Sequence, residues 1–214
     1  MKTVSVSLVG VGGQGIILTS DLLARAAAIA GYDVKKSEIH GMAQRGGSVT
    51  SQVRFGDAVY SPIIPHGTAD ILVSFDKVEA LRSASVLSSG GTALVNDMYL
   101  VPVTVSSGQQ SPVKDLDGRV GRTFKSLVLL DAQKIATEEV GNERTMNMVI
   151  AGALSTLCPF EEKVWLEAMK ELLSGPKAKL LDVNRKAFAI GRERAKASYF
   201  LDLIRRRRRK WENS

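Results

Sequence analysis

The sequence predicts an α/β protein: a three-layer α/β/α unit with a mixed, mostly parallel sheet, an inserted β-hairpin and a helical C-terminal part. Three observations predict this fold class. A β-prone run, a glycine-rich turn and an apolar helical segment follow one another within the first 30 residues. Later apolar runs are separated by segments with helical patterns, which favours parallel strand pairing. After Asn142 the chain has a helical pattern throughout.

The chain begins with a strand and a helix joined by glycines. Residues 4–9 form a valine-rich run typical of a strand. Residues 16–30 are rich in Leu, Ala and Ile and predict a helix, and Gly31 stands where a helix commonly ends. We expect the next extended segment to begin at residues 32–37.

An alternating segment predicts the antiparallel part of the sheet. From residue 49 to residue 55, apolar and polar side chains alternate, which is the pattern of a strand with one buried face. Gly56 and Asp57 then indicate a turn into residues 58–61. We interpret these two segments as the β-hairpin.

Three further apolar runs, at residues 71–73, 92–95 and 127–130, predict buried strands. Helical segments at residues 77–87 and 132–140 follow the first and the last of these runs. Both arrangements repeat the strand-then-helix order of the first 30 residues. We therefore expect these strands to pair in parallel within one sheet.

The rest of the chain divides into an irregular segment and a helical end. Residues 99–125 contain two prolines and few apolar runs, so we expect irregular connections and at most one strand, at residues 101–105. Helices are predicted at residues 145–157, at 161–173, and from about residue 180 through Arg194 and beyond.

The composition is that of an ordinary globular protein. Of the 214 residues, 44% are hydrophobic and 24% are charged, which excludes a disordered chain and fits one domain. The longest stretch without a charge, Thr3 to Ser20, holds four glycines, whereas a membrane-spanning helix needs about 20 mostly apolar residues. No cleavable signal segment is visible. We expect a cytoplasmic protein without membrane contact.

The positive charge is concentrated at the C-terminus. The formal net charge is +7, and Arg205 to Lys210 supply six positive charges, which leaves +1 for the remainder. We therefore divide the chain into a domain at residues 1–204 and a basic C-terminal tail at residues 205–214. A nearly neutral body is unlike the basic groove of a nucleic-acid-binding protein, so we expect no nucleic-acid partner.

Cysteine and histidine are scarce. Cys158 is the single cysteine and His40 and His66 are the two histidines. This count excludes an internal disulfide and a self-contained iron–sulfur cluster, which normally needs four thiolates. A zinc site built from the cysteine and histidines of this chain is equally disfavoured. We expect no metal in this chain, and Cys158 in its apolar surroundings is interpreted as a core residue.

A glycine loop after the first strand is the first candidate site. Its cofactor-binding candidates are Gly10, Gly12, Gly13, Gln14 and Gly15, which satisfy the pattern G-x-G-x-x-G between a strand and a helix. Glycines permit unusual backbone angles and let a phosphate approach the amides at the helix N-terminus. The alternative is a tight turn that only packs the helix on the strand.

The charges near this loop bear on the kind of ligand. An NAD site would place an acidic residue at the end of the second strand. The nearest acidic residues are Asp33, at the start of that strand, and Glu38. Lys35 and Lys36 suit an additional phosphate better than a ribose diol. The charges therefore favour NADP or coenzyme A over NAD.

A second polar, glycine-rich segment lies between two predicted strands, at residues 37–47. Its candidates for contact with a substrate or a subunit are Glu38, His40, Gln44, Arg45, Gly46 and Gly47. We expect the segment to lie beside the glycine loop, at the sheet edge where ligands bind. An arginine is well suited to phosphate or carboxylate. The alternatives are a structural histidine at position 40 and a solvated charge at position 45.

Four segments resemble the gamma-type domain of the 2-oxoacid:ferredoxin oxidoreductases. They are Gly-Val-Gly-Gly-Gln-Gly-Ile at 10–16, Ser-Glu-Ile-His-Gly-Met-Ala-Gln-Arg-Gly-Gly-Ser-Val at 37–49, Ala-Asp-Ile-Leu-Val-Ser-Phe at 69–75 and Asn-Met-Val-Ile-Ala-Gly-Ala at 147–153. They occur in order, and the resemblance covers about residues 4 to 195. Within this family the sequence is similar to the beta subunit of the indolepyruvate enzymes.

The resemblance implies a three-layer α/β fold and a place in a multi-subunit enzyme. Such an enzyme oxidatively decarboxylates an aryl pyruvate, here indolepyruvate, with coenzyme A to an acyl-CoA and CO2, and reduces ferredoxin. The resemblance also implies that the glycine loop, from Gly10 to Gly15, lies near the phosphates of coenzyme A. The basic tail lies outside the resemblance.

Thiamine sites of this class use Gly-Asp-Gly followed by paired asparagines. The nearest fragment is Gly56-Asp57-Ala58, and Asn-Asn does not occur in the sequence. We therefore expect no catalytic residue in this chain. Thiamine diphosphate, Mg²⁺ and the 4Fe-4S clusters are expected in a large partner subunit, through which ferredoxin is reduced.

Other functions remain open from the sequence. Within the family the 2-oxoacid could be pyruvate, ketoisovalerate or phenylglyoxylate. A free-standing NADP-dependent reductase would use the same glycine loop; Tyr32 and Lys36 have the spacing of a reductase pair, but they lie in a predicted strand. A third alternative is a binding module whose basic tail docks nucleic acid or an acidic partner.

Overall fold

The computed structural model describes residues 2–40 and 47–212, with the backbone alone described at 40, 103 and 198–212. Within these residues six strands form one sheet in the order β2-β3-β1-β4-β5-β6. The strands are β1 Val4–Val11, β2 Asp33–His40, β3 Ser48–Gly56, β4 Ala69–Ser74, β5 Leu87–Asn96 and β6 Leu127–Leu130. β1, β4, β5 and β6 pair in parallel, and β3 is antiparallel to both β1 and β2. The predicted mixed, mostly parallel sheet is confirmed.

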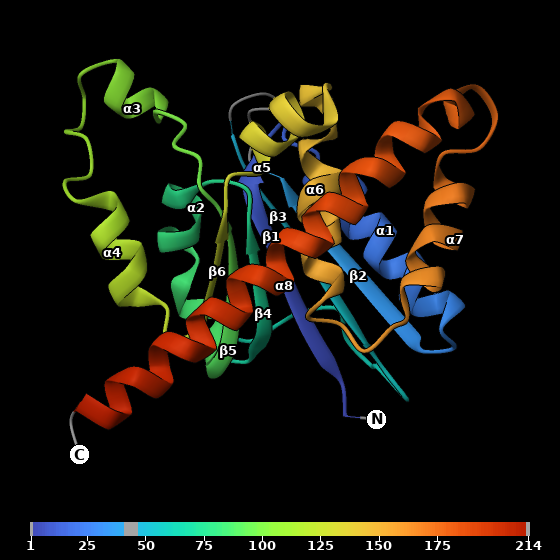
Figure 1. Ribbon diagram of the computed structural model, residues 1–214, viewed down its shortest axis with the longest axis horizontal. Helices are drawn as coiled ribbons and strands as arrows, with labels where there is room; N and C mark the ends of the chain where they lie inside the picture. Colours follow the sequence, from blue (N-terminus) through green and yellow to red (C-terminus); the bar gives the residue numbers. More distant parts are fainter. Residues whose placement is uncertain (1, 41–46, 213–214) are drawn as a thin grey trace.

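Helices cover both faces of the sheet (Figure 1). One face packs against α1 Ile16–Ile29, α6 Met146–Ser155, α7 Glu162–Leu172 and α8 Leu181–Glu212, and the other against α2 Lys77–Arg82 and α4 Leu116–Thr123. Neighbouring residues of β1 show the division, because Leu8 belongs to the first core and Val9 to the second. The three-layer fold class predicted by the sequence is thereby confirmed.

The predicted hairpin at residues 49–61 is wrong in its second strand. β3 pairs with β2, residue for residue from Asp33 opposite Gly56 to His40 opposite Val49, so the antiparallel pair is β2–β3. The chain that follows β3 is held by side-chain hydrogen bonds and not by pairing with another strand. The Arg54 guanidinium donates to the carbonyl of Ser61 at 2.9 Å. The Gln52 Oε1 accepts from the N–H of Ile64 at 2.9 Å.

Three other elements differ from their predicted bounds. The predicted helix at 77–87 ends at Arg82, because a short 3₁₀ turn, Ala84–Val86, carries the chain directly into β5. The predicted strand at 101–105 is replaced by α3 Val103–Ser106, where the carbonyl of Pro102 accepts two main-chain hydrogen bonds. The helix at 132–140 divides into α5 Ala132–Lys134 and a π-helical turn, Ile135–Val140.

The helical end agrees with its prediction. A 3₁₀ turn, Glu143–Thr145, precedes α6, and another, Gly175–Leu180, precedes α8. α8 extends to Glu212, and its last turns project beyond the sheet (Figure 1). No helix among the described residues has the length and apolar character needed to cross a membrane.

Two glycines permit a very close crossing of α6 and α8. A Cβ on Gly152 would lie 2.0 Å from the carbonyl oxygen of Phe188, and a Cβ on Gly191 would lie 2.0 Å from that of Val149. These obstacles are backbone atoms, which a rotamer change cannot move. Any larger residue at either position therefore forces the two helices apart.

We expect Gly191→Ala to destabilise the protein, because its methyl group would collide with the α6 backbone. The free energy of unfolding should fall by about 2 kcal/mol or more. Urea unfolding followed by circular dichroism measures this change. Gly121→Ala is the matched control, since nothing lies within 4 Å of the added methyl in α4, and it should stabilise the helix by about 0.5–1 kcal/mol. Equal midpoints for Gly191→Ala and wild type would contradict the close crossing.

Candidate functional site

The glycine loop forms a sharp turn between β1 and α1. Gly13 has φ +103° and Gly15 has φ +87°, both in the region that L side chains rarely adopt. Gly10 is required for a different reason, because a Cβ there would lie 2.8 Å from the Cβ of Phe75 at the end of β4. The loop is thus both a packing turn and an exposed backbone surface.

Gln14 turns its side chain back into the protein. Its Oε1 accepts from the N–H of Val11 at 2.7 Å, and its Nε2 donates to the carbonyl of Phe75 at 3.2 Å. The amide therefore ties the glycine loop to the end of β4. We assign Gln14 to holding the shape of the loop, because its polar atoms are already bound within the chain.

Gly47, at the end of the second glycine-rich segment, lies beside the glycine loop. The N–H of Gly12 donates to the carbonyl of Gly47 at 2.9 Å, and Val11 pairs with Ser48 at the end of the β1–β3 ladder. His40 is the last residue of β2. The predicted candidates Gln44, Arg45 and Gly46 lie outside the described residues.

The two lysine side chains of β2 form ion pairs with neighbouring carboxylates. Lys36 pairs with Glu38 at 2.5 Å and also contacts Asp21 of α1. Lys35 pairs with Asp33, and this hydrogen bond holds the pKa of the Asp33 carboxyl below its usual value. The two lysines that favoured an additional phosphate are therefore engaged with the protein itself.

A cavity of about 500 Å³ opens at the N-terminus of α1. Its lining residues are Gly12, Gly13, Gly15, Ile16, Ile17, Leu18, Asp21, Val49 and Lys177. The first N–H groups of α1 have no intrahelical acceptor, and among the described residues no side-chain hydrogen bond caps this end of the helix. These amides, the helix dipole and the Lys177 ammonium favour an anionic group at this end of the cavity.

Sequence reasoning missed Lys177 as a site residue. It lies in the turn before α8, about 160 residues after the glycine loop. No motif marks it, because a surface lysine after Gly-Pro is common and only the folded chain brings it over α1. Asp21 also lines this cavity and lies in α1, about one helical turn after Ile17. No sequence motif marks it either.

Asn147 is a third residue that the sequence did not indicate as part of the site. It lies in the first turn of α6 and is 7% exposed. A Cβ on Gly15 would lie 2.8 Å from its Nδ2, so the amide stands directly against the N-cap of α1. Its Oδ1 is buried and has no hydrogen-bond partner in the part of the chain that the structure describes.

A second cavity, of about 400 Å³, lies on the α2 side of the same sheet edge. Glu79, which is 3% exposed, accepts from the Ser48 hydroxyl at 2.6 Å and from Arg82 at 2.6 Å. Asp76 caps α2 by accepting from the N–H groups of Val78 and Glu79. These carboxylates are therefore satisfied by the protein.

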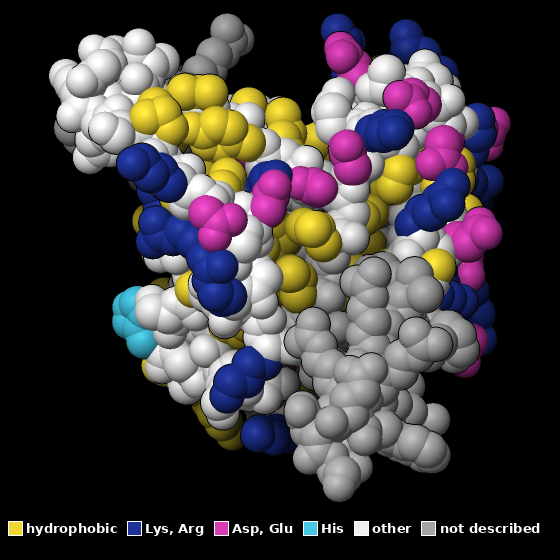
Figure 2. Space-filling view, turned by 60° about the vertical axis from the view of Figure 1, so that its left-hand side comes forward, with side chains coloured by type: hydrophobic (Ala, Val, Ile, Leu, Met, Phe, Trp, Pro, Cys, Tyr) yellow, Lys and Arg dark blue, Asp and Glu magenta, His cyan; other side chains and the backbone are white. Residues whose placement is uncertain are grey.

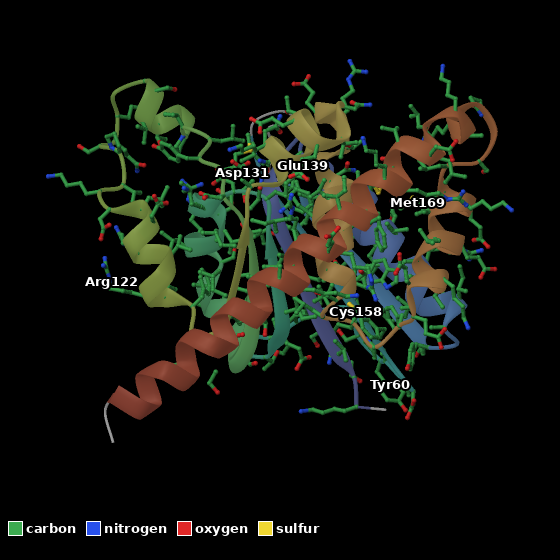
Figure 3. All side chains as sticks on the ribbon, in the orientation of Figure 1. Tyr60, Arg122, Asp131, Glu139, Cys158 and Met169 are labelled. Carbon is green, nitrogen blue, oxygen red and sulfur yellow. The ribbon has the colours of Figure 1, made fainter. Side chains whose placement is uncertain are left out.

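The described residues contain no group of three or more His, Cys, Asp or Glu side chains arranged to hold a metal ion. Cys158 follows α6 within the helical layer (Figure 3) and packs against the core. Burial raises the pKa of its thiol, which disfavours the reactive thiolate.

The face around α3 and α4 has charges of both signs. Figure 2 shows Lys and Arg side chains interspersed with Asp and Glu. Lys77 binds Asp97 and Asp117 at 2.6 Å each, and Arg122 binds Asp115 at 2.7 Å. Such paired charges do not form the continuous basic stripe typical of a nucleic-acid groove on this face.

Comparison with known proteins places this geometry in a family. The pyruvate ferredoxin/flavodoxin oxidoreductase family model matches residues 5–194. The chain is 43% identical to the indolepyruvate oxidoreductase subunit IorB of Pyrococcus horikoshii and 41% identical to that of Thermococcus kodakarensis. Each alignment covers 92% of this chain and 98% of the relative.

A solved structure agrees with the sequence relatives. The gamma subunit of a keto/oxoacid ferredoxin oxidoreductase from Geobacter sulfurreducens superposes with a TM-score of 0.67 at 26% identity, covering 91% of this chain and 99% of that subunit. The family match runs from β1 into α8, and the relatives and the solved structure each cover more than 90% of the chain. The chain therefore belongs to the pyruvate ferredoxin/flavodoxin oxidoreductase family.

Proposed function

We propose that this chain is the accessory subunit of an indolepyruvate:ferredoxin oxidoreductase. In this reaction the 2-oxoacid loses CO2, its acyl group passes to the thiol of coenzyme A, and two electrons pass to ferredoxin. The observation that carries the proposal is the similarity to two indolepyruvate oxidoreductase subunits along nearly their whole length. We assign the thiamine and iron–sulfur chemistry to a large partner subunit, and this assignment is supported by the lack of a metal-binding cluster of His, Cys, Asp or Glu among the described residues.

The proposed share of this chain is to hold the phosphates of coenzyme A. The supporting features are the uncapped N-terminus of α1, the open backbone of Gly13 and the Lys177 ammonium at one cavity. Asp21 on the same wall is suited to accept from a hydroxyl or amide N–H of the ligand. Coenzyme A carries both kinds of group, because phosphates, ribose hydroxyls and amides lie along one chain.

The NADP-dependent reductase has less support. Its extra phosphate was assigned to Lys35 and Lys36, and both ammonium groups are bound by carboxylates. Tyr32 and Lys36 do not form a helical pair, because Tyr32 precedes β2 and Lys36 lies within it. Coenzyme A therefore remains the ligand that the cavity favours.

The first expected result concerns the division of labour between subunits. The purified chain alone should show no oxidation of indolepyruvate, and adding the large subunit should produce turnover. Reduction of a viologen dye in the presence of indolepyruvate and coenzyme A measures the activity, with each subunit alone as a control. Turnover by the isolated, metal-free chain would contradict the accessory role.

The second expected result concerns the glycine loop. Gly13→Ala would place a methyl group in the cavity and keep a phosphate from the amides, so the KM for coenzyme A in the assembled enzyme should rise at least about tenfold. Gly31→Ala is a matched control at the other end of α1, because both glycines have positive φ and nothing lies within 4 Å of either added methyl.

Both variants should lose about 1 kcal/mol of stability through backbone strain. Only Gly13→Ala should change the kinetics. If the two variants have the same KM for coenzyme A, the loop is a packing turn and the proposed binding site is wrong.

The third expected result concerns the basic end at residues 205–214, which we propose is separable from the domain at 1–204. Deleting it should leave the urea midpoint and the KM for coenzyme A unchanged and reduce only the salt dependence of assembly or electron transfer. Replacing Arg205 to Lys210 with glutamines keeps the length of α8 and serves as the control for charge. A truncated chain that fails to fold would show that the end is structural.

A further inference from the structure

We infer that Asn147 binds the ligand of the glycine-loop cavity, its amide completing the anion site at the N-terminus of α1. This inference rests on the proposed coenzyme A site. It concerns a residue of α6, separated from the loop by about 130 residues of sequence. The starting observation is that Oδ1 of this buried amide has no partner among the described residues.

Contacts with α1 help to hold Asn147 in place. The hydroxyl of Thr19, which is fully buried, donates to the carbonyl of Gly15 at 3.2 Å or to that of Asn147 at 3.3 Å. The first turn of α6 is thus held against the N-cap of α1. Packing of the amide on Gly15 then leaves it little freedom to turn elsewhere.

An unpartnered amide at this position has no structural advantage. Its Oδ1 is removed from water without compensation among the described residues, so an apolar side chain of the same size would pack there at a lower energetic cost. The presence of an asparagine at this position is explained if the bound ligand supplies the missing hydrogen-bond partner. Nδ2–H then donates to a phosphate oxygen held by the α1 amides, and Oδ1 accepts from a neighbouring O–H or N–H of the same ligand.

The matched comparison is Asn184, which has the same side chain and nearly the same burial, at 8% exposed. Its Nδ2 donates to the carbonyl of Leu180 at 2.7 Å, so this amide already has a partner within the protein. The two asparagines should therefore respond in opposite ways to replacement by leucine.

The experiment measures stability and coenzyme A kinetics for Asn147→Leu and Asn184→Leu in the full chain and in the assembled enzyme. For Asn147→Leu we expect a urea midpoint equal to or above that of wild type and a KM for coenzyme A raised about tenfold or more, with kcat at saturating coenzyme A unchanged. For Asn184→Leu we expect a lower midpoint and an unchanged KM.

Asn147→Asp provides a second variant of the same shape in case leucine disrupts packing. The added negative charge favours the N-terminus of α1 in the free protein and repels a phosphate. Its KM should therefore rise further than that of Asn147→Leu. Coenzyme A should also raise the melting temperature of the wild-type chain and not that of the aspartate variant.

Two results would overturn the inference, and they are distinguishable from a failure of the proposed function. If Gly13→Ala raises the KM and neither Asn147 variant does, the coenzyme A site stands and Asn147 is structural. If Asn147→Leu lowers the urea midpoint with unchanged kinetics, the amide serves the fold. If the Gly13 and Asn147 variants all keep the wild-type KM, the cavity is not the coenzyme A site.

Discussion

The close crossing of α6 and α8 is the constraint on which the candidate site depends. Gly152 and Gly191 allow each helix to approach the backbone of the other, and this contact sets where α6 lies on the sheet. The N-terminus of α6 in turn presses Asn147 against the N-cap of α1. A packing contact deep in the helical layer therefore determines the geometry of a polar cavity at the edge of the sheet.

Polar side chains give that edge its rigidity. Strand ends leave N–H and C=O groups without ladder partners, and buried groups of this kind need other hydrogen bonds. Gln14 joins the ends of β1 and β4, and Asn96 donates to the carbonyl of Phe75 while accepting from the N–H of Ala132. Asp76 holds the N–H of Leu100. The backbone around the glycine loop is therefore well supported before any ligand binds.

Within this rigid edge, electrostatics decide what can bind. Lys36 lies between Asp21 and Glu38, so charges along β2 are largely neutralised by one another. The uncapped amides of α1 and the Lys177 ammonium remain as attractive groups for an anion at the other end of the cavity. In the proposed function this arrangement holds a phosphate-bearing ligand, and a partner subunit carries the thiamine and iron–sulfur chemistry.

The sequence by itself determined the strand–loop–helix unit, the layer order and the helical end, because periodicity and glycine conformation are local properties. Gly13 and Gly15 adopt the backbone angles that their residue type permits. Only the tertiary structure decided that β3 pairs with β2 and that Lys177 and Asn147 meet the glycine loop. A hydrophobic pattern shows which face of an element is buried, but the neighbour it is buried against depends on how distant segments pack, and that packing is settled only when the whole core forms.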